Sequence, residues 1–311
     1  MEFRNLGSSP LKVSLAGLGC NNFGMWIDEE KSREVIHKAL DLGVTLFDTA
    51  DAYGKRGGSE TIMGNILGSR RKDIVLATKF GLPMSDDARP ADGSRAYVMS
   101  AVEASLRRLK TDWIDLYQYH RPDPDTPLEE TLRAMDDLVK SGKVRFIGCS
   151  NMPVPQMTQA HEISKSKGLA PFVSCQDEYS LLMRDAEKEL IPAAKKLGMG
   201  LLPYFPLAGG VLTGKYRRGE KPMGTRMENR QDLRDRFLTE RNFAIADKLE
   251  TFVKSRNRTM LELAFSWLAA RPQVSSVIAG ATSAAQLEQN VKAVNWKPTP
   301  GEIAEIDRLS A

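Results

Sequence analysis

The sequence has little of several features that mark particular classes of protein. It has three cysteines in 311 residues, Cys20, Cys149 and Cys175, which are far apart and follow no metal-ligand spacing. Such a set argues against a disulfide framework and favours a reducing compartment, the cytoplasm. No apolar run approaches the roughly 18 residues of a membrane span. Residues 1–5 contain no apolar signal core, so we expect a cytoplasmic protein.

The chain also has only a small excess of charge of one sign. Lys and Arg number 44 and Asp and Glu number 40, which gives a formal net charge of +4. The basic residues are spread along the chain, and Arg70-Arg71-Lys72 and Arg217-Arg218 are only short clusters. A nucleic-acid or membrane surface is therefore not indicated, and small molecules are the expected partners. The composition leaves the oligomeric state open.

The chain alternates short apolar stretches with helical ones. Residues 3–14 are expected to form a β-hairpin around Gly7-Ser8-Ser9-Pro10. Strands are then predicted at 15–18, 46–48, 74–79, 113–120, 144–148, 172–176, 200–204 and 274–279. Helices are predicted to start at Asp28, Ser59, Ser94 and Thr126-Pro127, and to cover 154–166, 186–197 and 284–294.

About eight strand-then-helix units in a row predict a (β/α)₈ TIM barrel, a closed parallel sheet with helices outside. We expect one domain over residues 1–311, with long loops at 80–94 and 205–240 that serve function. An open doubly wound sheet is the alternative, and it would prefer a G-x-G-x-x-G turn after its first strand. Here Gly17-Leu18-Gly19 is followed by Cys20-Asn21-Asn22, so the third glycine is missing.

Polar residues stand where the predicted strands end. They are Asp48, Lys79, His120, Ser150, Asn151, Gln176 and Tyr204, and Tyr53 follows Asp48 by five residues. Taken singly, each has a structural explanation, such as a solvated lysine or a hydrogen-bonded loop histidine. In a barrel, however, the carboxyl ends of all strands converge on one mouth, where active sites lie. Acid, phenol, lysine and imidazole together predict an active site there.

The sequence resembles the aldo-keto reductase family over nearly its whole length. The matching segments are Phe47–Gly54, Ala77–Lys79, Asp115–His120, Gly142–Asn151, Leu207–Tyr216 and Ile278–Ser283. In detail they resemble the bacterial and potassium-channel-β-subunit-like branch. The resemblance implies a (β/α)₈ barrel that reduces aldehydes and ketones with a nicotinamide cofactor, usually NADPH.

The resemblance also implies roles for four catalytic residues. Tyr53 would be the general acid that protonates the carbonyl oxygen. Because a free phenol has a pKa near 10, it needs a nearby ammonium, Lys79, which favours the phenolate. Asp48 would keep Lys79 charged and oriented. His120 would donate a hydrogen bond to the substrate carbonyl, and these donors would stabilise the developing alkoxide.

The cofactor residues follow by position from the same resemblance. Ser150, Asn151 and Gln176 would hold the nicotinamide carboxamide, Tyr204 would stack on its ring, and Lys215 would contact the pyrophosphate. Loop 205–240 would clamp the cofactor, and its Arg226 would lie near the adenosine phosphate. The remaining predicted contacts are Pro206, Leu207, Gly210, Gly280, Thr282, Gln286, Gln289 and Asn290.

One departure bears on the choice of nucleotide. No basic residue occurs from Gly280 until Lys292, where the family often carries Lys or Arg. A 2′-phosphate would rely on the N-terminus of helix 284–294, on uncharged side chains and on Arg226. The channel-β-like branch uses a similar uncharged set with NADPH, so we favour NADP, with NAD as the alternative.

The substrate and two rival functions remain open at this stage. Met25, Trp26, Phe80 and Met84 are the predicted apolar walls of the substrate pocket. A cofactor-binding redox sensor with slow turnover would carry the same four catalytic residues. A non-redox barrel such as a hydrolase would need paired carboxylates, for which Asp48 and Asp51 are the candidates, or a metal cluster, and we expect no metal.

Overall fold

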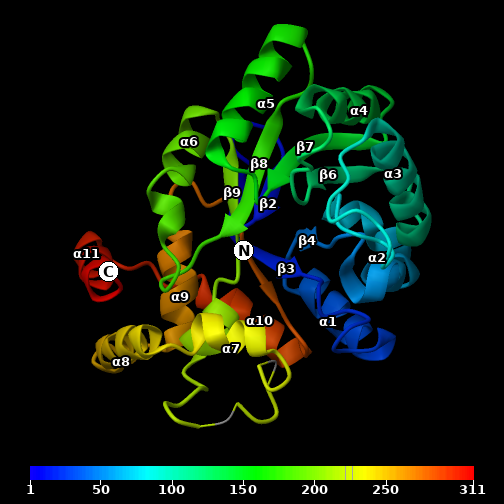
Figure 1. Ribbon diagram of the computed structural model, residues 1–311. Coiled ribbons are helices and arrows are strands. Elements are labelled where there is room, and N and C mark those ends of the chain that lie inside the picture. Colours follow the sequence, from blue (N-terminus) through cyan, green and yellow to red (C-terminus); the bar gives the residue numbers. More distant parts are fainter. Residues whose placement is uncertain (221, 226) are drawn as a thin grey trace.

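The protein folds around a parallel sheet that is nearly closed into a barrel (Figure 1). The computed structural model describes residues 1–220, 222–225 and 227–311, and in these residues the sheet has eight strands in the order β10-β3-β4-β5-β6-β7-β8-β9. The strands are β3 (Ala16–Gly19), β4 (Leu46–Asp48), β5 (Val75–Phe80), β6 (Ile114–Tyr119), β7 (Val144–Ser150), β8 (Phe172–Glu178), β9 (Gly200–Tyr204) and β10 (Val277–Gly280). The predicted (β/α)₈ barrel is confirmed.

The ring closes between β9 and β10 through a single parallel bridge. Leu201 pairs with Val274, just before β10. Its amide donates to the Gln273 carbonyl at 2.8 Å, and its carbonyl accepts from the Ser275 amide at 3.0 Å. The other neighbouring strands are joined by ladders of at least two registered residue pairs. Among the described residues, the β9–β10 seam is therefore held by this one bridge, near the amino ends of its strands.

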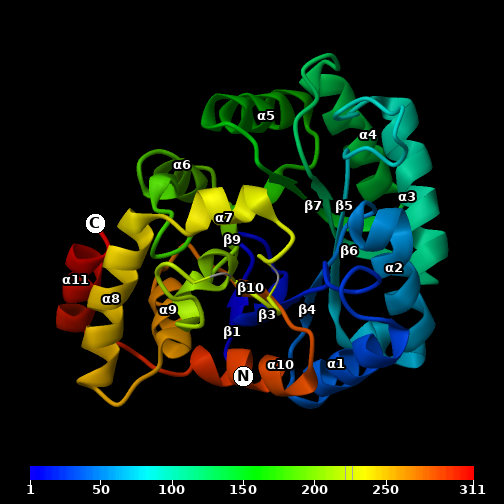
Figure 2. The ribbon, with the colours of Figure 1, turned by 60° about the horizontal axis from the view of Figure 1, so that its bottom comes forward.

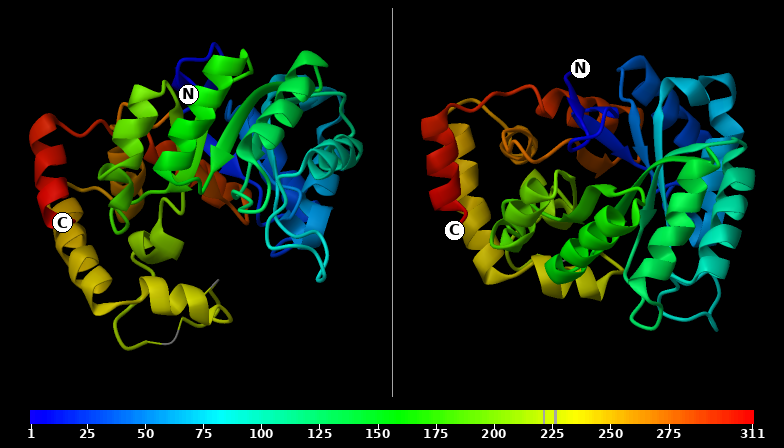
Figure 3. Two further views of the ribbon diagram at one scale, coloured as in Figure 1. Left: turned by 45° about the horizontal axis from the view of Figure 1, so that its top comes forward. Right: turned by 90° about the horizontal axis from the view of Figure 1, so that it is seen from above.

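A hairpin covers the amino-terminal end of the barrel, as the turn chemistry at residues 7–10 predicts. Its strands are β1 (Phe3–Asn5) and β2 (Lys12–Ser14), paired antiparallel. The Ser8 amide donates to the Gly198 carbonyl at 2.8 Å, and the Arg4 guanidinium donates to the Val274 carbonyl at 2.9 Å. In Figure 3 the hairpin lies at the end opposite the segment that carries α7.

Helices surround the strands and follow most of the predicted positions. They are α1 (Glu29–Asp41), α2 (Tyr53–Leu67), α3 (Arg95–Leu109), α4 (Leu128–Lys140), α5 (Val154–Lys167), α6 (Leu190–Lys196), α7 (Gln231–Phe237), α8 (Glu240–Lys254), α9 (Met260–Ala269), α10 (Ala284–Ala293) and α11 (Pro300–Leu309), with 3₁₀ turns η1 (Gly68–Asp73), η2 (Asp185–Glu187) and η3 (Ala208–Thr213). Asp28 and Ser94 cap α1 and α3 as predicted, because their side chains accept from amides in the first turn. Pro127 precedes α4 rather than opening it.

Four helices lie outside the predicted set, and the first of them, α7, falls within the predicted loop 205–240. Helices α8 and α9 occupy the chain between loop 205–240 and β10, and α11 packs beside α8 near the C-terminus (Figure 2). Helix α9 is buried at eight of its ten positions, so it lacks the polar face that marks an amphipathic helix. No helix in the described part of the chain is long and apolar enough to cross a membrane.

Strand side chains form an apolar layer inside the barrel, and a polar layer lies above it. The apolar residues Leu46, Ala77, Leu116, Leu202 and Ile278 form one cluster with Leu6 and Val13 of the hairpin region. Successive side chains on a strand point to opposite faces. Residues two positions later therefore also point inward, and these are Asp48, Lys79 and Gln118. The strands thus place a polar layer between the packed interior and the mouth.

Candidate active site

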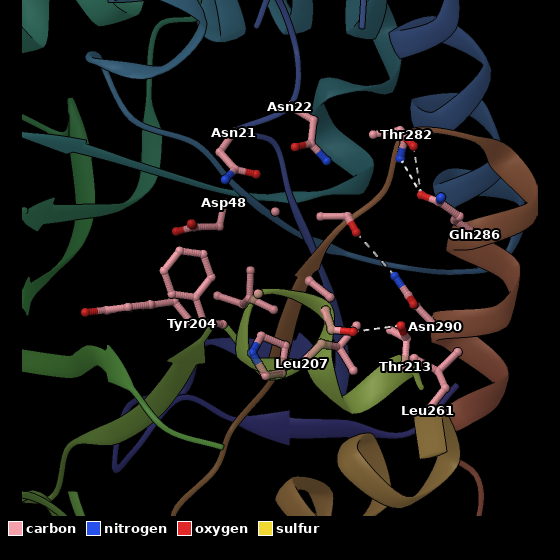
Figure 4. Close-up of a pocket in the computed structure, with 18 of the residues that line it drawn as sticks. Asn21, Asn22, Asp48, Tyr204, Leu207, Thr213, Leu261, Thr282, Gln286 and Asn290 are labelled. Carbon is pink, nitrogen blue, oxygen red and sulfur yellow. Dashed lines mark hydrogen bonds between the residues drawn. The ribbon is translucent and has the colours of Figure 1, made fainter. Parts of the chain in front are cut away.

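An elongated cavity of about 1240 Å³ opens at the carboxyl ends of the strands. At one end it reaches Asp48, Tyr53 and His120, and at the other it reaches the turn between β10 and α10. Figure 4 shows Asp48 and Tyr204 on one side of this cavity and Thr282, Gln286 and Asn290 on the other. Three of the four predicted catalytic residues, Asp48, Tyr53 and His120, and the described cofactor residues thus line one continuous space.

A buried ion pair lies beneath the catalytic end. The Lys79 ammonium is 2.7 Å from Asp48 Oδ2 and donates to the Thr49 carbonyl at 2.8 Å. Lys79 is 0% exposed. Burial alone would lower the pKa of Lys79, but the charge of Asp48 and the neighbouring Tyr53 outweigh it, and the pKa is raised above its ordinary value. The lysine is therefore a permanent cation at neutral pH.

Tyr53 and His120 lie next to this ion pair. Lys79 Nζ is 4.9 Å from the centroid of the Tyr53 ring, and the rings of Tyr53 and His120 meet edge-to-face at 5.7 Å. Burial, and then the charges of Lys79 and Arg121, hold the pKa of His120 well below its ordinary value. The imidazole is therefore neutral, and a neutral imidazole keeps one N–H that can donate. The structure brings the four predicted catalytic residues together.

The conformation of the chain after Tyr53 is unusual. Residues Gly54, Lys55, Arg56 and Gly57 have φ values of 67, 62, 69 and 106°. Glycine adopts this left-handed region freely, but it is unfavourable for Lys55 and Arg56. The right-handed part of α2 therefore begins beyond Gly57, close to the predicted start at Ser59. The Ser59 hydroxyl donates to the Cys20 carbonyl at 2.8 Å and holds this start in place.

The predicted carboxamide-binding residues contact one another at the ends of β7, β8 and β9. The Asn151 amide donates to the His120 carbonyl at 3.1 Å and to Ser150 Oγ at 3.0 Å. Its oxygen accepts from the Tyr204 hydroxyl at 2.8 Å. Burial raises the pKa of Tyr204 to about 12, so this phenol keeps its proton. Asn151 thereby connects the predicted nicotinamide site to the backbone of the catalytic histidine.

The segment after β9 supplies the middle of the cavity wall. Pro206, Leu207, Gly210 and Lys215 all line the cavity. Gly210 has a φ of 104°, and a Cβ there would lie 2.9 Å from Lys215 Cε, so the absence of a side chain leaves space for the lysine. Arg226, predicted to reach the adenosine phosphate, lies outside the described residues.

The turn between β10 and α10 forms the far end of the cavity. Gly280, Thr282, Gln286, Gln289 and Asn290 line it, as predicted from their positions. The Gln286 side-chain oxygen accepts from both the Thr282 amide and its hydroxyl, each at 2.9 Å. The Ser283 side chain caps α10, so polar groups and the amides of a helix N-terminus face the same end, an arrangement suited to an anion.

Of the four predicted substrate-wall residues, only Trp26 lines the cavity among the described residues. Trp26 lines the cavity mouth and is 45% exposed, and its neighbour Met25 is 50% exposed. The prediction for Phe80 is wrong. Phe80 follows the inward-pointing Lys79, so strand alternation turns its side chain outward, where it is fully buried and its ring centroid lies 4.8 Å from that of Tyr117. Met84 is half-buried on its loop and does not line the cavity.

Several residues at the site were not predicted. Gln118 on β6 is fully buried and donates to Asp48 Oδ1 at 3.1 Å, and Gln176 donates to the same oxygen at 2.9 Å. Asn21 and Asn22 line the cavity after β3. The signal for Gln118 is strand alternation, because it stands two positions beyond the inward-pointing Leu116.

The lining fits a nicotinamide dinucleotide better than a metal. Amide and hydroxyl groups, one aromatic ring and Lys215 follow one another along the cavity, and these groups suit a carboxamide, a flat ring and a pyrophosphate. In the described ranges, no three His, Cys, Asp or Glu residues come together as a metal site. Asp48 pairs with Lys79, whereas Asp51 Oδ2 faces the Tyr97 hydroxyl at 3.5 Å, so the two carboxylates do not act as a pair.

Comparison with known proteins identifies the family. The pattern of the Aldo/keto reductase family matches residues 16–311, and the chain therefore belongs to this family of oxidoreductases. It is 37% identical over 320 residues to a "Probable voltage-gated potassium channel subunit beta" of Arabidopsis thaliana, covering 99% of this chain and 96% of that protein. It is 35% identical over 320 residues to the "L-glyceraldehyde 3-phosphate reductase" of Escherichia coli K12, covering 99% and 92%.

A third relative is the "Uncharacterized oxidoreductase YrpG" of Bacillus subtilis, which is 37% identical over 307 residues, or 94% of this chain and 91% of that protein. The relatives thus include proteins named as reductases and proteins named as channel subunits. They agree with the branch that the sequence motifs resemble.

Proposed function

We propose that the protein reduces an aldehyde or ketone to an alcohol with NADPH, and that Tyr53 is the proton donor. The observation that carries this proposal is the buried ion pair of Lys79 and Asp48 beside Tyr53, at the end of a cavity that suits a dinucleotide. A buried cation next to a phenol has a direct chemical use, because it stabilises the phenolate that remains after the proton leaves.

Each side chain then has a defined task. The nicotinamide supplies the hydride when it is bound. Tyr53 gives its proton to the carbonyl oxygen, and Lys79 stabilises the negative charge left on the phenol. Neutral His120 donates a hydrogen bond that orients the carbonyl. Asp48, through its contact at 2.7 Å, holds the Lys79 ammonium in position.

NADP is the proposed nucleotide, with NAD as the alternative. The N-terminus of α10, capped by Ser283 and lined by Thr282 and Gln286, supports an anion at the adenosine end. The ratio of kcat/KM with NADPH to that with NADH tests this assignment. A ratio below one would favour NAD. The three thiols of the described chain are buried and unpaired, which supports our proposal of a cytoplasmic enzyme.

A redox sensor is the second candidate, and the similarity to a probable channel β subunit supports it. In that case a bound nucleotide would be oxidised once and exchanged slowly. Single-turnover and steady-state rates separate the two functions. An enzyme should sustain many turnovers, whereas a sensor should show one oxidation followed by a steady-state rate far below it.

The decisive experiment compares Tyr53→Phe with the wild type on a panel of aldehydes, ketones, quinones and sugars. Loss of the general acid should lower kcat by about 10²-fold to 10⁴-fold, while the Kd for NADPH stays within about twofold. Tyr97→Phe is the matched control, because it removes a phenol that does not line the cavity. Reduction by Tyr53→Phe at nearly the wild-type rate would refute the assigned mechanism.

A further inference from the structure

The polar layer above the barrel interior contains two glutamines that share one carboxylate oxygen. Gln118 Nε2 donates to Asp48 Oδ1 at 3.1 Å, and Gln176 Nε2 donates to the same atom at 2.9 Å. Gln176 Nε2 also donates to Gln118 Oε1 at 3.4 Å. Asp48 Oδ2 is left for Lys79. The carboxylate is thus held on one side by two amides and on the other by the ammonium.

This geometry fixes the orientation of both amides. An ionised carboxylate only accepts hydrogen bonds, so each glutamine must turn its nitrogen toward Asp48. Gln176 uses both N–H bonds in doing so, one to Asp48 and one to Gln118. Its Oε1 accepts from no group in the described residues, and Gln176 lines the cavity. The end of Gln176 that serves the cavity is therefore an acceptor.

A glycine, Gly148, lies on the strand between the two glutamines. Gln118 lies on β6 and Gln176 on β8, and Gly148 of β7 pairs in register with Gln118. A Cβ at Gly148 would lie 2.3 Å from Ser174 Oγ and 3.4 Å from Gln118 Cγ. A side chain at this position would therefore occupy space beside the glutamine pair. The glycine thus leaves room for the Ser174 hydroxyl and lies against the Gln118 side chain.

We propose that Gln118 is a positioning residue that holds Gln176 with its oxygen toward the carboxamide end of the cofactor site and holds Asp48 against Lys79. The proposal rests on the proposed function, because it assigns that end of the cavity to the nicotinamide. It predicts that Gln118, which does not line the cavity, determines affinity for the nicotinamide half of the cofactor and leaves the adenosine half unaffected.

The test measures binding of two ligands by isothermal titration calorimetry. One ligand is NADP⁺, and the other is adenosine 2′,5′-bisphosphate, which has the adenosine end without nicotinamide. Gln118→Leu should raise the Kd for NADP⁺ about tenfold, as expected for one misplaced acceptor, and change the Kd for the bisphosphate less than about twofold. Ser174→Ala is the matched control, because Ser174 Oγ is equally buried and has no partner in the described chain.

A second variant keeps the test informative if Gln118→Leu does not fold. Glutamate at this position (Gln118→Glu) has nearly the same shape, but its ionised form cannot donate to Asp48. Its charged neighbours are Asp48, which accepts from Gln118, and Lys79, which pairs in register with it on β5. Protonation of the glutamate restores a donor. The Kd of Gln118→Glu for NADP⁺ should therefore recover toward the wild-type value as the pH falls from 8 to 6. The Kd of the wild type should show no such decrease over this range.

The outcomes separate the inference from the function on which it rests. Unchanged NADP⁺ affinity in both variants, or equal weakening for both ligands, would overturn the role of Gln118. A wild-type protein that binds NAD⁺ instead is tested with NAD⁺ and ADP in the same way. A wild type that binds none of these nucleotides would overturn the proposed function itself.

Discussion

Asp51 offers the sharpest test of the electrostatics near the site. It is 1% exposed, and no group of the described chain donates to its Oδ1. Burial, followed by the charge of Glu60, raises the pKa of Asp51 to about 8. Its carboxyl group is therefore protonated in the folded protein at neutral pH, whereas in the unfolded chain it ionises near pH 4. The unfolded state binds fewer protons over this interval, so stability falls as pH rises.

The magnitude follows from the interval between the two pKa values. Each pH unit between about 4 and 8 lowers the free energy of unfolding by about 1.4 kcal/mol. Asp51→Asn resembles the protonated acid and removes this dependence. The variant should therefore be more stable than the wild type by about 1.5 kcal/mol at pH 5 and about 4 kcal/mol at pH 7.

Urea denaturation at pH 5, 6, 7 and 8 measures this difference directly. The advantage of Asp51→Asn should grow with each step in pH. Asp41→Asn, an exposed carboxylate at the end of α1, is the control, and its effect should be small throughout. A difference between Asp51→Asn and the wild type that is the same at every pH would refute the reasoning, because it would mean that Asp51 ionises equally in both states.

Two further predictions concern His120 and Phe80. Because the pKa of His120 lies well below its ordinary value, kcat/KM for carbonyl reduction should show no imidazole titration between pH 8 and 6. Arg121→Gln should raise the pKa of His120, and an acid limb near pH 6.5 in the wild type would contradict this account. Phe80→Ala should lower the free energy of unfolding by about 3–5 kcal/mol, measured by denaturation. Trp26→Ala should instead change KM. A changed KM for Phe80→Ala with an unchanged free energy of unfolding would place Phe80 in the substrate pocket after all.

Much of the site could be predicted because a barrel gathers its strand ends. Asp48, Lys79 and His120 are 31 and 41 residues apart along the chain, yet parallel strands with a common direction bring them to one mouth. Topology alone supplies this proximity, and no knowledge of side-chain packing is needed. The same reasoning extends to Ser150, Gln176 and Tyr204.

The features that could not be predicted from the sequence depend on side-chain orientation and on strand register. Phe80 looks like a pocket residue because it adjoins Lys79, but adjacent strand residues face opposite sides. Gln118 resembles an ordinary strand residue until its register with Lys79 places it in the polar layer. Helix α7 was missed because it lies within the predicted loop 205–240, and α9 was missed because it is apolar on nearly all sides.

The seam between β9 and β10 has a mechanical consequence. Tyr204 stands at the end of β9, and Gly280 ends β10, so the two walls of the cavity follow strands that are joined only near their amino ends. A long ligand can therefore enter between these walls without breaking a ladder of hydrogen bonds. Beyond this bridge the described strands β9 and β10 share no hydrogen-bonded ladder, so the sheet itself does not fix the spacing of the two cavity walls.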